Sequence, residues 1–256
     1  MKILFIGDIV GRPGRNILRD NLSILKKEYQ FDTLIINGEN AAHGKGITPK
    51  IYQEFIRLGI DVITLGNHAF AKQIILDELD CCDSLVRPRN MNPTNVGKYV
   101  KVIKTKEGTL AVHSILGEVF MNNVSESAFI AFEKSLQEVN ADMHLVDFHA
   151  EATAEKQTFF YKFKDSCVAI LGTHTHVTTA DEMVVDGCAY ISDVGMTGVT
   201  QSILGRDIEE VMLNLEGEKT FYKVASGQAH LSAVLVTIVD KRATNIERIK
   251  IIQETY

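Results

Sequence analysis

The sequence predicts an α/β fold made of one domain over residues 1–256, with a parallel half and a more antiparallel half packed together. Two observations carry this prediction. Strands and helices alternate through the first third of the chain, which is typical of a mainly parallel sheet. Beyond residue 98 the strands follow one another more closely, and no Pro-rich or Ser-rich linker or internal repeat divides the chain. A chain of 256 residues can bury a large core.

The first third contains three expected strands and two expected helices. The strands are apolar runs at 2–7, 32–37 and 61–66, and helical spacing of apolar residues marks 14–29 and 48–59. The second helix carries clear boundary signals, with Thr48 as its N-cap, Pro49 at its first position and Gly59 at its end.

The rest of the chain predicts a hairpin at 99–116 around a Glu-Gly turn, a helix at 127–139, and further strands. We expect these strands at 143–149, 167–176, 182–193, 231–240 and 246–252. In an extended strand alternate side chains share a face, so His174 and His176 should point the same way while Thr175 points opposite. Two imidazoles on one face suit a metal ion, although such pairs also occur on strands without a ligand role.

The composition of the chain limits the kinds of partner that it is expected to bind. The chain has 33 acidic and 27 basic residues and a net charge of -6, which disfavours tight binding to duplex DNA or long RNA but leaves a small phosphorylated molecule open. No apolar run reaches the roughly 20 residues of a membrane span, and the N-terminus reads as a strand rather than a signal peptide, so a cytoplasmic protein is expected. The four cysteines form no metal-binding spacing and are expected to be buried or half-buried reduced thiols.

Polar residues follow five of the expected strands, where α/β proteins bind their ligands. They are Asp8, Glu39 with Asn40, Asn67 with His68, His149, and His174 with His176. Singly, each has a structural explanation: a helix cap, a tight turn or a buried histidine. Together, carboxylates, amides and imidazoles in one cleft need cations to compensate them. Their number exceeds one tetrahedral ion and fits two adjacent metal ions, the arrangement used for phosphoester hydrolysis. The mixed nitrogen and oxygen set favours Fe, Mn or Zn over Mg or Ca.

The sequence does not match the motifs of two other kinds of site, the phosphate-binding loop and the nucleophile elbow. The stretch GENAAHGKGI departs from a phosphate-binding loop because one residue too many separates Gly38 from Gly44, and Gly46 stands where Ser or Thr should be. No nucleophile elbow of the type G-x-S-x-G is present.

The motifs GD at 7–8, NGEN at 37–40, GNH at 66–68, the single His149 and GTHTH at 172–176 resemble those of the calcineurin-like metallophosphoesterases. More closely, FIGDIVGRPGR, INGENAAHGKG, VDFHAEATAEK, TADEM and ISDVGMTG resemble the bacterial YmdB-type family, over nearly the whole chain. The resemblance implies a four-layer αββα sandwich of mixed sheets and a 2′,3′-cyclic-nucleotide phosphodiesterase, a metal-dependent phosphoric diester hydrolase.

The resemblance also implies roles for these residues. Asp8, Glu39, Asn40 and His176 would hold one metal; Glu39, as the bridge, would hold the second together with Asn67, His149 and His174. We expect two divalent or trivalent transition-metal ions per chain, Fe or Mn before Zn. His68 would be the catalytic histidine, protonating the leaving ribose oxygen as a metal-bridging hydroxide attacks phosphorus.

One segment departs from the family. GNHAFAK stands where the family has Thr-Trp-Asp after the histidine, so Ala69 and Ala71 remove polar groups near the expected substrate site. Substrate-binding residues stay unassigned. Arg12, Arg15, His43 and Lys45 could touch phosphate or base, or could be solvated surface residues.

Two alternatives stay open: a phosphomonoesterase, as a protein phosphatase or a nucleotidase, and a metal-binding regulator acting through partners. The native metal, the preferred base, the pathway and a homo-oligomeric state also stay open.

Overall fold

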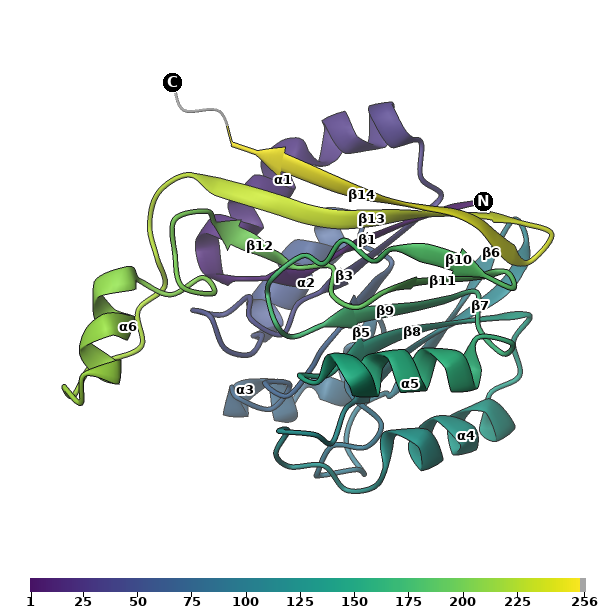
Figure 1. Cartoon of the computed structure of the whole chain (residues 1–256), viewed down its shortest axis with the longest axis horizontal. Coiled ribbons are helices and arrows are strands. Elements are labelled where there is room, and N and C mark those ends of the chain that lie inside the picture. Colours follow the sequence, from purple (N-terminus) through teal and green to yellow (C-terminus); the bar gives the residue numbers. More distant parts are fainter. Residues whose placement is uncertain (254–256) are drawn as a thin grey trace.

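The computed structural model describes residues 1–253, except the side chain of residue 80 (Figure 1). Its helices are α1 (Gly11–Tyr29), α2 (Pro49–Arg57), α3 (Gln73–Leu76), the 3-10 helix η1 (Leu79–Cys81), α4 (Ala128–Glu138), α5 (Thr153–Phe163) and α6 (Ile208–Leu215). None of the helices in this described part has the length and apolar character needed to cross a membrane.

The first sheet has eight strands in the order β2-β12-β13-β1-β3-β4-β5, with β14 also paired to β13. Its strands are β1 (Lys2–Ile6), β2 (Asp8–Ile9), β3 (Thr33–Asn37), β4 (Val62–Thr64), β5 (Leu85–Val86), β12 (Met196–Val199), β13 (Ala229–Val239) and β14 (Arg242–Ile252). Strands β1, β3, β4 and β5 run parallel, as the alternating pattern of the first third predicts, whereas β13 runs antiparallel to both β1 and β14.

The second sheet has six strands in the order β10-β11-β9-β8-β7-β6. They are β6 (Val100–Thr105), β7 (Gly108–Leu116), β8 (Met143–His149), β9 (Ala169–Thr173), β10 (Met183–Val185) and β11 (Cys188–Ile191). The hairpin predicted at 99–116 is present as β6 and β7. The prediction of a more antiparallel second half is wrong for the centre of this sheet: β7, β8, β9 and β11 are parallel, and only the edge strands are antiparallel. Helices α4 and α5 connect β7 to β8 and β8 to β9, and such crossovers make neighbouring strands parallel.

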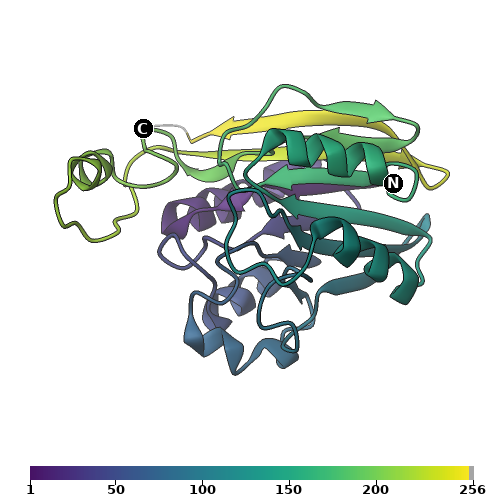
Figure 2. The same cartoon turned by 60° about the horizontal axis from the view of Figure 1, so that its bottom comes forward.

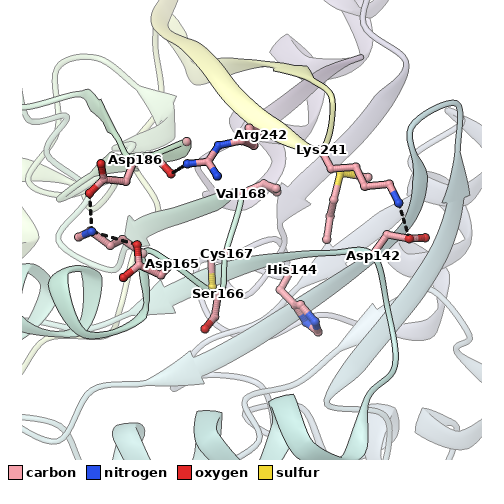
Figure 3. A pocket seen from close by; sticks show the side chains of 12 residues that line it. Asp142, His144, Asp165, Ser166, Cys167, Val168, Asp186, Lys241 and Arg242 are labelled. Carbon is pink, nitrogen blue, oxygen red and sulfur yellow. Dashed lines mark hydrogen bonds and ion pairs between the residues drawn. The ribbon is translucent and has the colours of Figure 1, made fainter.

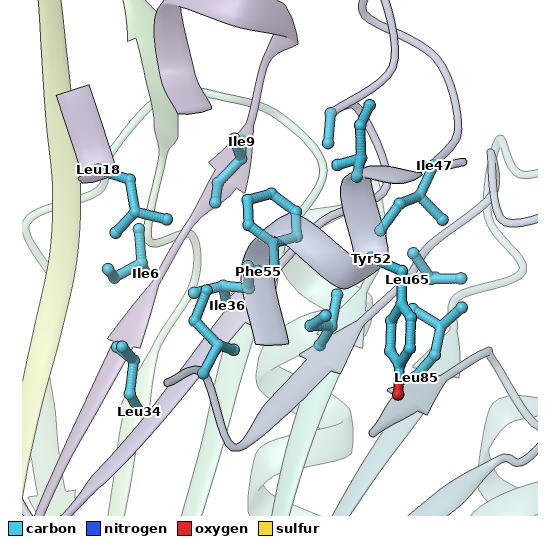
Figure 4. Packing of buried hydrophobic residues seen from close by; sticks show 14 of the residues in the cluster. Ile6, Ile9, Leu18, Leu34, Ile36, Ile47, Tyr52, Phe55, Leu65 and Leu85 are labelled. Carbon is cyan, nitrogen blue, oxygen red and sulfur yellow. The ribbon is translucent and has the colours of Figure 1, made fainter. Parts of the chain in front are cut away.

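Three hydrophobic clusters define four layers. One cluster joins α1 and α2 to the first sheet. Figure 4 shows Phe55 of α2 next to Ile36 and Tyr52 of α2 next to Leu65 and Leu85. A second lies between the sheets, and the third joins α4 and α5 to the second sheet. The structure is therefore the αββα sandwich of mixed sheets that the resemblance implies.

Local signals explain the best-defined helix. The Thr48 hydroxyl accepts a hydrogen bond from the backbone N–H of Ile51, and Pro49 occupies the first helical position, as predicted. By contrast, α6 projects from the body of the molecule (Figure 2), and the chain returns from it toward the sheets.

Three cysteines are buried free thiols, but Cys81 is exposed, contrary to the expectation for all four.

Candidate metal centre

The carboxyl ends of parallel strands from both sheets meet at one edge of the sandwich. Strands β1, β3 and β4 of the first sheet and β8 and β9 of the second lead into this edge. The structure brings together all eight residues that the sequence analysis singled out: Asp8, Glu39, Asn40, Asn67, His68, His149, His174 and His176.

His149 is the centre of one group. Its Nε2 lies 2.9 Å from Oδ1 of Asn67, 3.2 Å from Oε1 of Glu39 and 3.0 Å from Nδ1 of His174. One ligand atom each from Glu39, His149 and His174 lie within 4.8 Å of one another. These four side chains are the set that the resemblance assigns to the second metal.

A second group adjoins the first. The Asn40 Nδ2 group donates to Oε1 of Glu39 at 3.1 Å and lies 3.0 Å from Nε2 of His176. Oδ1 of Asp8 is 4.0 Å from both His176 Nε2 and His149 Nδ1. Glu39 thus touches both groups, which is the position that a bridging carboxylate requires.

The two histidines of the GTHTH motif reach the centre in a way that differs from the prediction. Strand β9 ends at Thr173, and His174 and His176 have φ values of 102° and 65°, so neither belongs to an extended strand. His174 and His176 therefore do not share one face of a strand, and that prediction is wrong. They are directed to the centre by a left-handed loop, a conformation that non-glycine residues rarely adopt.

The outer nitrogen of His149 is fixed by a chain of hydrogen bonds. The Thr173 hydroxyl donates to Oδ1 of Asp147 at 2.6 Å, so its oxygen accepts from His149 Nδ1–H at 2.8 Å. Asp147 is fully buried and also accepts from Asn37 and Thr64, at 2.9 and 2.5 Å. Because the proton sits on Nδ1, the Nε2 lone pair of neutral His149 faces Glu39 and can bind a metal.

The other two histidines are held in the same manner. His174 Nε2 lies 3.0 Å from the carboxylate of Glu151, and His176 Nδ1 donates to the Leu204 carbonyl at 3.0 Å. In each neutral imidazole the nitrogen that faces the centre is left with its lone pair. Carboxylates and carbonyls in these positions are typical outer partners of metal-binding histidines.

Burial and neighbouring charges shift the pKa values of several groups at the centre. Burial raises the pKa of Asp8 to about 7. Burial lowers the pKa of His174 to about 3, so this imidazole is neutral at pH 7. Burial alone would lower the pKa of His149, but the carboxylate of Glu39 outweighs it and raises the value to about 9. Burial alone would raise the pKa of Glu39, but its contact with His149 outweighs burial and holds this pKa below its usual range.

These residues fit a metal site on two further observations. Oδ1 of Asp8 is buried and has no hydrogen-bond donor among the described residues, which is costly unless a cation faces it. A Cβ atom at Gly66 would overlap with His149 Nε2 and Glu39 Oε2, so only glycine leaves the space between them open. Cations in the two groups would satisfy the orphaned oxygen of Asp8 and accept the lone pairs of the three imidazoles.

A cavity of about 290 Å³ opens beside these residues. His68 lies in its wall, and the backbone N–H of His68 donates to Oε2 of Glu39 at 3.0 Å. Burial lowers the pKa of the His68 imidazole. The wall also contains Lys45, Glu151, Leu204, Arg206 and Tyr222.

Sequence reasoning found only part of this wall. Of the four cationic candidates, Lys45 lines the cavity, whereas Arg15 is paired with Glu54 at 2.7 Å and Arg12 and His43 are exposed outside it. Glu151 follows the end of β8 and could have been found by the strand-end rule. Arg206 and Tyr222 come from the segment around α6, which carries no local signal of a binding role.

The departure after His68 has a different meaning from the one expected. Ala69 is fully buried in the core cluster beneath α2, so it does not face the cavity. Ala71 is exposed, and Phe70 packs against the same core. Neither alanine is among the residues that line the cavity.

A smaller hollow lies at the opposite ends of the same strands (Figure 3). There Lys164 pairs with Asp165 and Asp186, at 3.0 and 2.5 Å, and Lys241 pairs with Asp142 at 2.6 Å. These opposite charges compensate one another directly. Unlike the edge with His149, this hollow needs no cation.

Comparison with known proteins agrees with the geometry. A 2′,3′-cyclic-nucleotide 2′-phosphodiesterase from Bacillus subtilis strain 168 is 42% identical over 256 residues, covering 98% of this chain and 97% of its own. A crystal structure described as a novel phosphatase of Mycoplasma pneumoniae superposes with a TM-score of 0.93 at 34% identity, covering 98% of this chain and 93% of its own. A hypothetical protein from Thermus thermophilus superposes with the same TM-score at 33% identity, covering 99% and 100%. The profile of the YmdB-like proteins matches residues 4–249, and the chain therefore belongs to the YmdB-like family, within the metallophosphoesterase fold.

Proposed function

We propose that this chain is a phosphodiesterase with a dinuclear metal centre that hydrolyses 2′,3′-cyclic nucleotides. The observation that carries the proposal is the fixed orientation of three histidines. Each has its outer ring nitrogen against a neighbouring oxygen. The inner nitrogen of His149 faces the carboxylate of Glu39, that of His174 faces His149, and that of His176 faces the amide of Asn40. The activity named for the B. subtilis relative supports the choice of substrate.

The ligand sets follow from the two groups around Glu39. Asp8, Asn40 and His176 hold the first ion with Glu39, and Asn67, His149 and His174 hold the second. Fe or Mn, with Zn as the alternative, suits this mixture of imidazole nitrogen and carboxylate or amide oxygen. When bound, the ions supply a nucleophile by lowering the pKa of water and withdraw charge from the phosphoryl oxygens.

The protein's own groups position the substrate. The Lys45 ammonium lies 5.1 Å from the Tyr222 ring centroid, and the Arg206 guanidinium lies 4.9 Å from it, paired with Glu210. Lys45 brings positive charge to the cavity of a chain whose net charge is negative, and it attracts a phosphate anion. The charge of Arg206 is compensated by Glu210, so Arg206 contributes N–H groups and its contact with Tyr222. Tyr222 and Leu204 offer an apolar wall for the nucleoside.

His68 acts on the leaving group. Its backbone is held by Glu39, so the ring is placed beside the ligand groups without being one of them. Burial lowers the pKa of His68, but an anionic phosphate bound next to the ring favours its protonated form. The imidazolium then donates its proton to the departing ribose oxygen, which is a poor leaving group as an alkoxide.

A panel of substrates tests the proposal. Metal-loaded protein should hydrolyse a 2′,3′-cyclic nucleotide much faster than the corresponding 2′- and 3′-monophosphates. The M. pneumoniae structure is described as a phosphatase, so the alternative is a phosphomonoesterase, and preference for the monophosphates would establish it. Hydrolysis of none of these substrates with both ions bound would favour a regulatory protein.

The substrate is a small molecule in this proposal. With a net charge of -6, the chain should not bind duplex DNA or long RNA tightly at physiological salt. Sub-micromolar, steeply salt-dependent binding in a gel-shift experiment would contradict this expectation.

A further inference from the structure

A buried ion pair lies next to the loop that carries His174 and His176. Lys156 comes from α5 and Asp193 follows β11, and the Lys156 Nζ lies 2.9 Å from Asp193 Oδ2. Their side chains are only 3% and 1% exposed. Neither residue faces the cavity, and neither belongs to the proposed ligand sets.

Both partners of the pair bind the backbone of the histidine loop. The Lys156 ammonium donates to the Thr173 carbonyl at 2.9 Å, immediately before His174. Oδ2 of Asp193 accepts from the Thr175 backbone N–H at 2.9 Å, immediately after His174. The peptide groups on both sides of His174 are thus tied to one buried ion pair.

Asp193 also connects the loop to the chain that leads into β12. Its Oδ1 accepts from the Gly195 N–H at 2.8 Å, and its backbone exchanges hydrogen bonds with Thr179. The Met196 N–H in turn donates to the His176 carbonyl at 3.2 Å. The loop is therefore held at both of its histidines.

The backbone of this loop needs such support. His174 and His176 have positive φ values, and for a non-glycine residue this conformation persists only where the surroundings impose it. The Thr173 carbonyl and the Thr175 N–H define the orientation of His174, and Asp193 and Lys156 bind these two groups. An ion pair can serve here because each charge is shielded from water and satisfied by backbone partners.

We propose that Lys156 and Asp193 are positioning residues that hold His174 and His176 in the metal-binding geometry. The proposal rests on the metal centre of the proposed function. It predicts that loss of the pair weakens metal binding beyond what its effect on folding explains. Outer partners of metal ligands commonly change metal affinity by about 10- to 100-fold.

The experiment compares single and double variants. Lys156→Met and Asp193→Asn each leave one unpaired charge in a buried site, so each should lower the free energy of unfolding. The double variant Lys156→Met/Asp193→Asn removes both charges, and its thermal midpoint should recover toward the wild type. Its metal affinity should not recover. The Thr173 carbonyl loses its ammonium donor, and the asparagine side chain has one acceptor oxygen for the two backbone N–H groups, of Thr175 and Gly195, that the carboxylate binds.

Two readouts separate positioning from stability. Competition with a chromophoric chelator measures the dissociation constants of Mn²⁺ and Zn²⁺ on folded protein, and we expect them to rise about 10- to 100-fold in the double variant. Amide hydrogen exchange in the metal-free protein should be faster at Thr175 than in the wild type. Arg89→Met is the matched control. It breaks a different ion pair, between Arg89 and Glu138 at 2.7 Å, and should leave both the metal dissociation constants and the exchange at Thr175 unchanged.

The outcomes are distinct. Metal dissociation constants within twofold of the wild type in the double variant, with unchanged exchange at Thr175, would overturn the positioning role. If the double variant fails to fold, Asp193→Asn is compared with Arg89→Met by the same two readouts. Wild-type protein that binds no metal would instead contradict the proposed function, and exchange at Thr175 would still test the tie to the loop.

Discussion

Nε2 of His149 and Nδ1 of His174 face one another at 3.0 Å, although His149 ends β8 and His174 follows β9. The outer N–H of His149 donates a hydrogen bond to the Thr173 hydroxyl, and the outer nitrogen of His174 lies 3.0 Å from the carboxylate of Glu151. The facing nitrogens of the two neutral imidazoles therefore both carry lone pairs. Such a pair needs a shared cation, a role that a proton would fill in the metal-free protein and a metal ion in the proposed enzyme.

The shared proton predicts a pH dependence of the metal-free protein. The pKa of His149 is about 9 in the folded chain and 6.5 ordinarily, so the folded state binds this proton more tightly than the unfolded state. Its stabilising effect is complete below pH 6.5 and is lost as the pH rises through 9. Asp8, whose pKa is about 7 in the folded chain and 3.8 ordinarily, acts in the same direction but over a lower range, between pH 3.8 and 7.

Chemical denaturation of metal-free protein should show the free energy of unfolding falling by roughly 2–3 kcal/mol between pH 6.5 and 9. His149→Gln should be less stable at pH 6.5 and should show a much flatter profile. A profile equally steep in His149→Gln would mean that another group binds the proton.

Glu39→Ala should disturb both metal sites, because its carboxylate contacts His149 on one side and Asn40 on the other. Purified wild-type protein should carry close to two transition-metal ions per chain, and the variant should retain fewer than one, measured by elemental analysis. Glu151→Gln is the comparison, since Glu151 contacts His174 at the rim and this variant should weaken one site. Full activity after exhaustive chelation would contradict a metal-dependent mechanism.

His68→Ala should keep both metal ions and lose about 10²–10⁴ in rate on a 2′,3′-cyclic nucleotide, whose leaving oxygen needs a proton. An aryl phosphodiester has a delocalised phenolate leaving group, so the loss on that substrate should be much smaller. His43→Asn, at an exposed position outside the cavity, should retain wild-type rates on both. Equal losses on the two esters would assign His68 to phosphate binding, and loss of metal would make it a ligand.

Gly66→Ala should abolish tight metal binding and, because the overlapping side chains are buried, should also lower the free energy of unfolding by roughly 1–3 kcal/mol. The added methyl group would overlap with His149 Nε2 and Glu39 Oε2, the atoms between which an ion would bind. Gly59→Ala is the matched control, because no atom lies within 4 Å of its added Cβ, and its positive φ costs roughly 1–2 kcal/mol of stability. Metal titrations on both variants check this, and unchanged affinity in Gly66→Ala would place the ions elsewhere.

The sequence by itself determined the ligand-type residues and the edge at which they meet. Asp8, Asn40 and Asn67 follow consecutive parallel strands, and the order of strands and helices is enough to bring such ends together. Thr48 and Pro49 likewise defined a helix start from neighbouring residues alone. These features depend on periodicity and local hydrogen bonding, both of which can be read along the chain.

Helix α5 shows why other elements could not be read in this way. It buries Glu155 and Lys156 along with its phenylalanines, so its apolar periodicity is weak and the sequence analysis does not predict it. The burial of Lys156 makes sense only with Asp193, 37 residues away in the sequence. A pattern of apolar residues does not reveal a buried charge whose partner lies in another element.

The tertiary structure alone decided how the histidines reach the centre and what faces them. The left-handed backbone at His174 and His176 depends on contacts with Lys156, Asp193 and Met196 that no local propensity supplies. Arg206 and Tyr222 enter the cavity wall from a segment whose own sequence carries no binding motif. Strand ends converge because of chain topology, whereas ligand geometry and the cavity wall arise from packing between distant segments.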